Sequence, residues 1–206
     1  DESGRPLGIV HRDVSPDNVL IGFNGMVKLV DFGIAKAMNS VSTTRTGTLK
    51  GKFAYMAPEQ LRAGSKADAR TDVYAMGVLL YELVTGRTPF DVEQLLATGY
   101  EAVLRTIREE EPPKPSTRIS TLAAKELSAV AAKRGAEPAR LSRVVRGDLD
   151  WIVMKALEKD RQRRYETADG LAADLTRFLD SRPVLARSPS FRDRMQKLAR
   201  RHRMAF

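Results

Sequence analysis

The stretch IVHRDVSPDNVLIGFNGMVKLVDFG, residues 9–33, decides the fold class of this chain. Inside it, apolar runs at residues 19–21 and 27–30 flank the pair Asn24-Gly25. Both residues of an Asn-Gly pair tolerate a positive φ, so such a pair between two apolar runs predicts a β-hairpin. Polar and charged residues stand at both ends of this hairpin, and it therefore brings two polar motifs close together.

Helical patterns fill most of the chain after the hairpin. Residues 72–85 (DVYAMGVLLYELVT) are almost wholly apolar and stop at Gly86, which predicts a helix buried on all sides. Residues 92–110 predict a second helix, which the pair Pro112-Pro113 ends. The expected fold class is mainly α with a small β-hairpin region.

The last part of the chain mixes irregular and amphipathic stretches. Residues 114–147 are irregular in composition, with a helix expected near 122–134, and we interpret them as an insertion on the surface. Residues 150–158 and 167–179 have the apolar spacing of amphipathic helices, with Thr167 as a candidate cap.

Length and composition exclude several classes of protein. The 206 residues leave room for one ordinary domain or two small ones, and 42% hydrophobic with 30% charged residues is a globular balance. No apolar run approaches the ~18 residues of a membrane span. The absence of cysteine excludes disulfides, thiolate zinc sites and a cysteine nucleophile, and two histidines are too few for a His-rich metal site.

The net charge of +9 is concentrated at the C-terminal end. Residues 183–206 contain seven basic residues and one acidic residue. Residues 191–206 place apolar side chains at helical spacing between basic ones, which is typical of a basic amphipathic segment. Two interpretations stay open, binding to an anionic membrane surface and a solvated tail. Nucleic acid is not expected as a partner, because no aromatic residues are interleaved with the charges.

Three motifs follow one another in the first part of the chain. H-R-D-x-x-x-x-N occupies residues 11–18, D-F-G residues 31–33 and A-P-E residues 57–59. A loop rich in Ser and Thr is expected at 34–56, before the third motif. Each motif alone is weak, but the three in this order form the protein-kinase signature set.

On these motifs the chain resembles the C-terminal lobe of bacterial Ser/Thr protein kinases of eukaryotic type, from about residue 9 to residue 179. No G-x-G-x-x-G-x-V loop and no V-A-x-K lysine is present, so the N-terminal lobe is expected before residue 1, and the whole domain would be α+β. The implied domains are a partial kinase domain at 1–180, with the insertion near 114–147, and a basic tail at 181–206.

The resemblance implies protein Ser/Thr phosphorylation with ATP and Mg²⁺. Asp13 would accept the proton of the substrate hydroxyl, and Asn18 and Asp31 would hold Mg²⁺ and thereby ATP. Protein substrates are the expected partners. Residues 1–206 alone are expected to be inactive, and the parent protein is expected to be cytoplasmic, with a possible anchor in the inner membrane through a helix after residue 206.

Further residues receive structural or regulatory roles from the same resemblance. His11 is expected to pack near Phe32 and to bond to backbone, and Glu59 is expected to pair with Arg164. Arg12 would meet a phosphate on the loop before A-P-E. The residues with such roles are His11, Arg12, Phe32, Gly33, Glu59, Asp72 and Arg164.

The expected phosphorylation sites are Thr44 and Thr46, a T-x-T pair in that loop. Other hydroxyls of the loop remain alternatives, namely Ser40, Ser42, Thr43 and Thr48.

Two positions depart from the family pattern. Ser15 stands where a lysine is usual, two residues after Asp13, and Gly51-Lys52 stands where Gly-Thr is usual. In one interpretation, Lys52 and Ser15 have exchanged the places of the cation and the hydroxyl in the catalytic site. In the other, two independent losses have produced a pseudokinase that acts as a binding or scaffold module. The catalytic loop lacks the Arg-bearing variant of tyrosine kinases, which favours Ser and Thr as acceptors.

Overall fold

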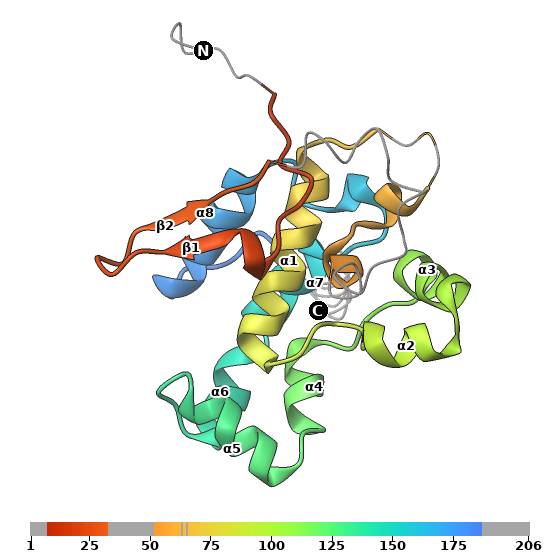
Figure 1. Ribbon diagram of the computed structural model, residues 1–206. Helices are drawn as coiled ribbons and strands as arrows, with labels where there is room; N and C mark the ends of the chain where they lie inside the picture. Colours follow the sequence, from red (N-terminus) through yellow and green to blue (C-terminus); the bar gives the residue numbers. More distant parts are fainter. Residues whose placement is uncertain (1–7, 33–51, 63, 65, 187–206) are drawn as a thin grey trace, which may run out of the picture.

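The computed structural model describes residues 8–32, 52–62, 64 and 66–186 (Figure 1). The strands are β1 (Val19–Ile21) and β2 (Val27–Leu29). The α-helices are α1 (Ala69–Thr85), α2 (Val92–Thr98), α3 (Tyr100–Glu109), α4 (Pro115–Ser120), α5 (Ala124–Ala132), α6 (Pro138–Val145), α7 (Asp148–Ala156) and α8 (Ala168–Leu179). Short 3₁₀ turns are η1 (Pro16–Asn18), η4 (Lys52–Tyr55), η5 (Pro58–Leu61) and η6 (Arg161–Arg163).

The predicted hairpin is confirmed. β1 and β2 pair as antiparallel strands. Gly25 in the connecting loop has a φ of 79°, a left-handed value that glycine adopts without steric cost, and its N–H donates to the carbonyl of Gly22 over 2.8 Å. Beyond the strands, the N–H of Val30 donates to the carbonyl of Asn18 over 2.9 Å. The hairpin therefore brings the end of the first motif beside the start of the second.

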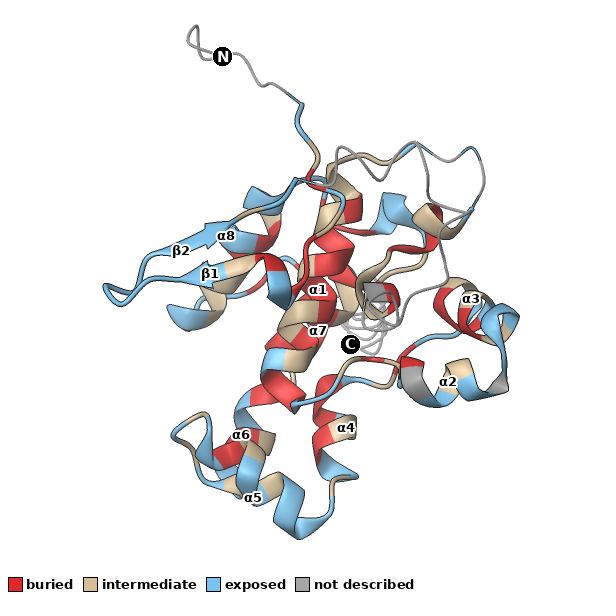
Figure 2. Ribbon diagram, viewed as in Figure 1, coloured by how far each residue is buried: buried red, intermediate tan, exposed pale blue. Residues whose placement is uncertain are grey.

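Helix α1 begins earlier than the sequence pattern suggests. The side chain of Asp68 accepts a hydrogen bond from the N–H of Arg70 over 2.9 Å and caps the helix, so α1 starts three residues before the expected stretch 72–85. It ends as expected at Gly86, whose φ is 79°. Burial on all sides is wrong, because Leu83 is 62% exposed, although most of α1 is buried (Figure 2).

The centre of the molecule is the contact of α1 with α7, which lie side by side in Figure 1. A Cβ atom on Gly77 would lie 2.8 Å from the Cβ of Ala156, so only glycine allows the two helices to approach this closely. The largest hydrophobic cluster surrounds this contact and includes Tyr74, Val78, Tyr81, Ile119, Leu141, Val145, Leu149, Val153 and Leu157.

Two expectations for the middle of the chain need correction. Residues 92–110 form two helices, α2 and α3, because Gly99 between them has a φ of 116°, which is incompatible with a continuous helix. The helix expected near 122–134 is confirmed as α5, but the rest of 114–147 is not irregular, since α4 and α6 lie there as well. Ile119 and Leu141 from these helices belong to the largest cluster, so this segment is part of the core and does not merely lie on the surface.

The helices near the C-terminal end agree with the sequence pattern. α8 begins after Thr167, whose hydroxyl accepts a hydrogen bond from the N–H of Gly170 over 3.2 Å and caps the helix as predicted. Packing continues past Arg182-Pro183, because Val184 and Ala186 are buried in a second hydrophobic cluster, which α1, α7 and α8 also form. Within the residues described, no helix combines the length and apolar character needed to cross a bilayer.

Candidate active site

A carboxylate from α1 fixes the start of the catalytic loop, residues 11–18. Asp72 accepts hydrogen bonds from two successive backbone N–H groups, those of His11 and Arg12, each over 2.7 Å. Arg12 has a φ of 67°, a left-handed conformation that is strained for a residue with a Cβ atom. Such a conformation persists only where its surroundings impose it, and Asp72 supplies that constraint.

His11 links the loop to the end of β2. Its Nε2 lies 2.9 Å from the carbonyl oxygen of Val30, which only accepts, so Nε2 carries the proton. Its Nδ1 accepts the N–H of Asp13 over 3.3 Å. The His11 ring packs on Phe32 with 4.6 Å between ring centroids. Both contacts expected for His11, with backbone and with Phe32, are thus present, and both of its nitrogens are engaged in holding structure.

Asn18 is buried and is oriented by Asp13. Its Nδ2 donates to the backbone carbonyl of Asp13 over 2.7 Å and to the Asp13 carboxylate over 3.1 Å. Because the nitrogen end of the amide is committed to Asp13, its oxygen is the end that can ligate a metal. Asp31 follows β2, is exposed and has a φ of 58°.

The donor set suits Mg²⁺. A carboxylate from Asp31 and an amide oxygen from Asn18 are both hard oxygen ligands, which Mg²⁺ prefers, and this ion usually takes few protein ligands beside water and phosphate. In the described part of the chain, no group of three or more His, Cys, Asp or Glu residues could hold a metal by itself. The two residues would therefore share the ion with a phosphate-bearing ligand.

Several predicted site residues cannot be placed. Gly33, Thr44 and Thr46 lie outside the described residues, and so does the side chain of Lys52, whose backbone belongs to η4. Ser15 is 2% exposed, and its hydroxyl has no hydrogen-bond partner among the residues that the structure describes. The roles predicted for Lys52 and Ser15 therefore stay predictions.

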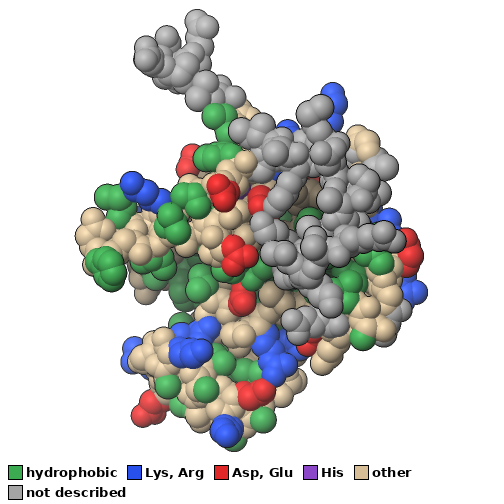
Figure 3. Space-filling model, in the orientation of Figure 1, with side chains coloured by type: hydrophobic (Ala, Val, Ile, Leu, Met, Phe, Trp, Pro, Cys, Tyr) green, Lys and Arg blue, Asp and Glu red, His purple; other side chains and the backbone are tan. Residues whose placement is uncertain are grey.

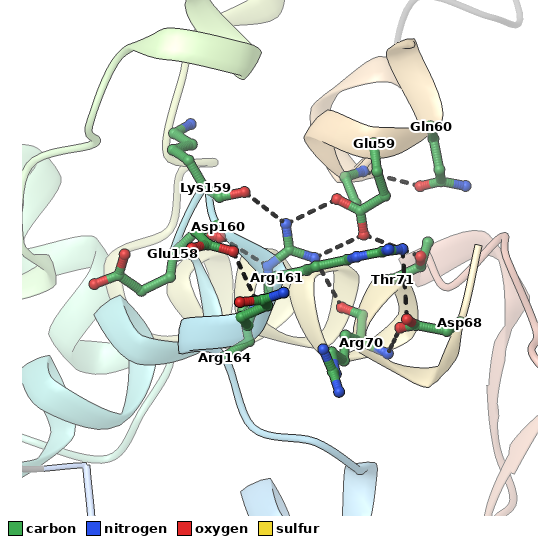
Figure 4. Close-up of polar contacts among 12 residues, drawn as sticks. Glu59, Gln60, Asp68, Arg70, Thr71, Glu158, Lys159, Asp160, Arg161 and Arg164 are labelled. Carbon is green, nitrogen blue, oxygen red and sulfur yellow. Dashed lines mark hydrogen bonds and ion pairs between the residues drawn. The ribbon is translucent and has the colours of Figure 1, made fainter. Parts of the chain in front are cut away.

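Glu59 and Arg164 form the buried ion pair that the sequence predicts (Figure 4). Two nitrogens of Arg164 donate to the two carboxylate oxygens of Glu59, each over 2.8 Å, and Thr71 donates its hydroxyl to Glu59 over 3.0 Å. Arg164 also donates to the carbonyls of Glu158 and Arg70. Burial opposes the ionisation of Glu59, but the hydrogen bonds and charge of Arg164 outweigh it and lower the Glu59 pKa.

Gln60 is a site residue that the sequence analysis missed. Its Nε2 donates to the backbone carbonyl of Arg12 over 2.9 Å, and its Oε1 accepts the N–H of Ala57 over 2.9 Å. The only sequence signal was its place directly after Glu59 of the A-P-E motif. Thr71, which binds Glu59, was missed in the same way.

A small depression lies beside Asp13. The catalytic loop, the turns η4 and η5 and helix α1 line it, and Tyr55 and Gln60 face it from the side of the turns. The hydroxyl of Tyr55 donates to the carboxylate of Glu82 on α1, and burial together with this bond raises the pKa of Tyr55. The site thus combines the Asp13 carboxylate, the oriented Asn18 amide and a small pocket beside Asp13.

Comparisons with known proteins point in one direction. The family model described as a protein kinase domain matches residues 6–175. A probable serine/threonine-protein kinase of Corynebacterium efficiens is 42% identical over 176 residues, which is 84% of this chain and 23% of that protein. The serine/threonine-protein kinase PknB of Mycobacterium tuberculosis is 38% identical over 178 residues, 85% of this chain and 24% of PknB.

One similar protein has a different name. The tyrosine-protein kinase MasK of Myxococcus xanthus is 39% identical over 182 residues, 87% of this chain and 23% of MasK. The chain thus spans about a quarter of the length of the curated relatives it matches.

Proposed function

Because this chain belongs to the protein kinase domain family, whose members generally use ATP and Mg²⁺, we propose that the whole protein transfers the γ-phosphate of ATP to Ser and Thr hydroxyls of proteins. One observation carries the proposal. Asp13 and Asn18 are joined by two hydrogen bonds in a loop that Asp72 holds in a strained conformation. Strain of this kind is concentrated at functional sites.

The residues support this chemistry by position and charge. Asp13 lies beside the pocket, where its carboxylate would accept the proton of a substrate hydroxyl as the phosphoryl group moves. Asn18 and Asp31 would hold Mg²⁺, and the bound ion would neutralise charge on the ATP phosphates. Phosphoryl transfer needs little covalent help from the protein, so this small set of groups suffices once ATP is positioned.

The choice between Ser/Thr and Tyr acceptors rests on the catalytic loop. The loop lacks the Arg-bearing variant of tyrosine kinases, and two of the three relatives described above are named serine/threonine-protein kinases. The third is named a tyrosine-protein kinase, so phosphoamino-acid analysis of the product is the direct check. Phosphoserine or phosphothreonine is expected, and phosphotyrosine alone would contradict the proposed specificity.

The lobe that holds adenine is proposed to lie outside these 206 residues. The sequence contains no Gly-rich loop and no V-A-x-K lysine. Several hydrophobic side chains lie on the surface of the β1–β2 hairpin in Figure 3, and Leu20, Ile21, Met26 and Val27 are all exposed. A face of this kind would be covered in the complete domain. We accordingly expect residues 1–206 alone to be inactive.

The exchange of Lys52 and Ser15 remains part of the proposal. A buried hydroxyl without a partner among the described residues calls for one, and the ammonium of Lys52 would supply it beside Asp13. The alternative function, a pseudokinase that binds without catalysis, is favoured by the same orphan hydroxyl if Lys52 points elsewhere. The Lys52→Ala variant separates them: a loss of kcat of about tenfold supports the exchange.

The remaining proposals concern the domain boundaries, the C-terminal tail and the loop before A-P-E. A partial kinase domain over 1–180 would be followed by a basic tail at 181–206, which would lie on an anionic membrane surface next to a membrane helix of the parent. Phosphates on Thr44 and Thr46 would pair with Arg12 and order the loop.

The decisive test is an Asp13→Asn variant of the full-length protein, assayed with ATP, Mg²⁺ and a protein substrate. Loss of the proton acceptor is expected to lower kcat about 10²- to 10⁴-fold. The matched control is Asp17→Asn, an exposed carboxylate of the same loop, which should leave kcat unchanged. A wild-type protein without phosphotransfer, or an Asp13→Asn variant with full activity, would refute the proposed function.

A further inference from the structure

We propose that Gln60 is a positioning residue of the phosphotransfer site, because its side-chain amide joins the backbone of the catalytic loop to the backbone that enters η5. The inference rests on the proposed function and adds a residue to it. One amide serves two segments: Nε2 donates to the carbonyl of Arg12, and Oε1 accepts from the N–H of Ala57, both over 2.9 Å.

The bond to Arg12 acts on the peptide group that leads into Asp13. The carbonyl of Arg12 and the N–H of Asp13 belong to the same planar peptide. Gln60 holds the oxygen of that peptide, and Nδ1 of His11 accepts its N–H over 3.3 Å. Because both edges are held, the plane from which the Asp13 side chain departs has a defined orientation.

The same bond completes the constraint on a strained residue. The N–H of Arg12 is held by Asp72 over 2.7 Å, and its carbonyl is held by Gln60, while its φ stays at 67°. A left-handed residue with a Cβ atom persists only where its surroundings over-determine it. Asp72 holds one side of this strained residue and Gln60 holds the other.

Gln60 can position another segment because its own backbone is fixed. Its N–H donates to the carbonyl of Ala57 over 2.9 Å within the turn η5. Its neighbour Glu59 is held by Arg164 and Thr71 (Figure 4). In that view Glu59 and Gln60 stand on one turn, and the Glu59 carboxylate reaches the Arg164 guanidinium. The position of Asp13 is thus coupled through Gln60 to the buried ion pair.

The chemistry of an amide makes the inference testable. Gln60→Met keeps the length of the side chain but forms neither bond. Gln60→Glu keeps the acceptor for Ala57, yet its ionised carboxylate would face the carbonyl oxygen of Arg12 without a proton to donate. With the ordinary pKa of a glutamic acid, about 4.3, the introduced carboxyl is ionised at neutral pH, so the bond to Arg12 is lost while the bond from Ala57 can remain.

The experiment measures kcat and KM of the full-length protein between about pH 5.5 and pH 8. Gln60→Met should lower kcat about tenfold at every pH while the KM for ATP changes less than about twofold. Gln60→Glu should match that loss at every pH of this range, because its carboxylate stays ionised and cannot donate to Arg12. The charged or titratable side chains around Gln60 are Arg12, Asp13, Tyr55, Glu59 and Asp72, and all remain in every variant, so kcat is compared as its ratio to wild type.

Controls and contrary outcomes separate this inference from the proposed function. Gln162, exposed in η6, provides matched Met and Glu variants that should leave kcat unchanged. An unchanged kcat in Gln60→Met, or in Gln60→Glu, would overturn the positioning role. If the wild type itself shows no phosphotransfer, the proposed function fails, and hydrogen exchange then tests the role of Gln60. The backbone amides of Asp13 and Ala57 should exchange faster in Gln60→Met than in wild type. Equal exchange rates would overturn the inference.

Discussion

The catalytic loop and the β1–β2 hairpin carry the two halves of the candidate metal site, yet they are held in opposite ways. Side chains from α1 and η5 fix the loop, and Asn18 within it is buried. The hairpin that leads to Asp31 exposes its apolar side chains, with Ile21 74% and Val27 64% exposed. Figure 2 shows the same contrast, because the hairpin is exposed where α1 is buried.

The catalytic loop is fixed by contacts within the described residues, whereas the hairpin needs a further surface to pack against. An isolated two-stranded hairpin is marginally stable in water and gains stability from packing against another layer. The position of Asp13 follows from contacts among the described residues, whereas the position of Asp31 also depends on whatever covers the hairpin. The predictions below test the held side first and the exposed side second.

The largest effect is expected from Arg164→Ala, which removes the anchor of η5. The variant leaves the carboxylate of Glu59 buried without its cation, and loss of one partner of a buried pair costs about 3–5 kcal/mol of unfolding free energy. Hydrogen exchange of the α1 amides in the full-length protein measures the change. Arg87→Ala is the control, because it breaks the exposed pair with Glu126 and should cost below about 1 kcal/mol.

Acid should produce the same defect without a mutation. The folded-state pKa of Glu59 is below its ordinary value of 4.5, so the stability from this pair is present above pH 4.5 and is lost as the pH falls through the folded-state pKa. In the mutational test, equal losses of unfolding free energy in Arg164→Ala and Arg87→Ala would show that the buried pair of Glu59 and Arg164 does not anchor η5.

A smaller effect is expected from Ile21→Ser on the exposed side of the comparison. If the hairpin face is covered in the full-length protein, the variant should lose about 1.5–3 kcal/mol of stability there, the value of burying one large apolar side chain. In the chain of residues 1–206 the same change should be nearly neutral, because Ile21 is already exposed. Differential scanning calorimetry compares Ile21→Ser with wild type, once in the full-length protein and once in residues 1–206. Equal stability of variant and wild type in both proteins would show that nothing covers the hairpin face.

Local signals in the sequence predicted the elements whose causes are local. The pair Asn24-Gly25 predicted the hairpin, Gly86 predicted the end of α1, and Thr167 predicted the cap of α8, because each acts through its own backbone neighbours. Of the helices in 114–147, α5 was expected near 122–134, whereas α4 and α6 were missed because their stability comes from packing of residues such as Ile119 into the core, which no local pattern reveals.

The site divides in the same way. The motifs predicted Asp13, Asn18 and Asp31 as site residues, because the resemblance to protein kinases assigns roles to positions within these motifs. Gln60 was missed because its partner Arg12 lies 48 residues earlier in the sequence, and only the folded chain brings the two together. A single sequence therefore signals positioning residues such as Gln60 less clearly than residues that would contact a substrate.

The last effect concerns Lys159, a half-buried cation whose backbone carbonyl accepts a hydrogen bond from Arg164. Its Nζ donates to the carbonyl of Ile107 over 2.7 Å and lies 4.7 Å from the centre of the Phe90 ring. Burial, followed by the charge of Arg164, lowers the pKa of Lys159 from 10.5 to about 8. Between these two pH values the unfolded chain binds more protons than the folded one, so the contribution of Lys159 to the unfolding free energy rises with pH.

The test compares Lys159→Met with wild type from pH 7 to pH 10.5 by urea unfolding of the full-length protein. The stability of wild type relative to the variant should be constant below pH 8 and should increase between pH 8 and pH 10.5, because deprotonation removes the cost of a buried charge. Lys66→Met, at an exposed position near α1, is the control for the loss of any lysine. Two results would show that burial of the Lys159 ammonium does not cost stability. One is a stability of wild type relative to Lys159→Met that decreases with pH, and the other is a slope equal to that of its stability relative to Lys66→Met.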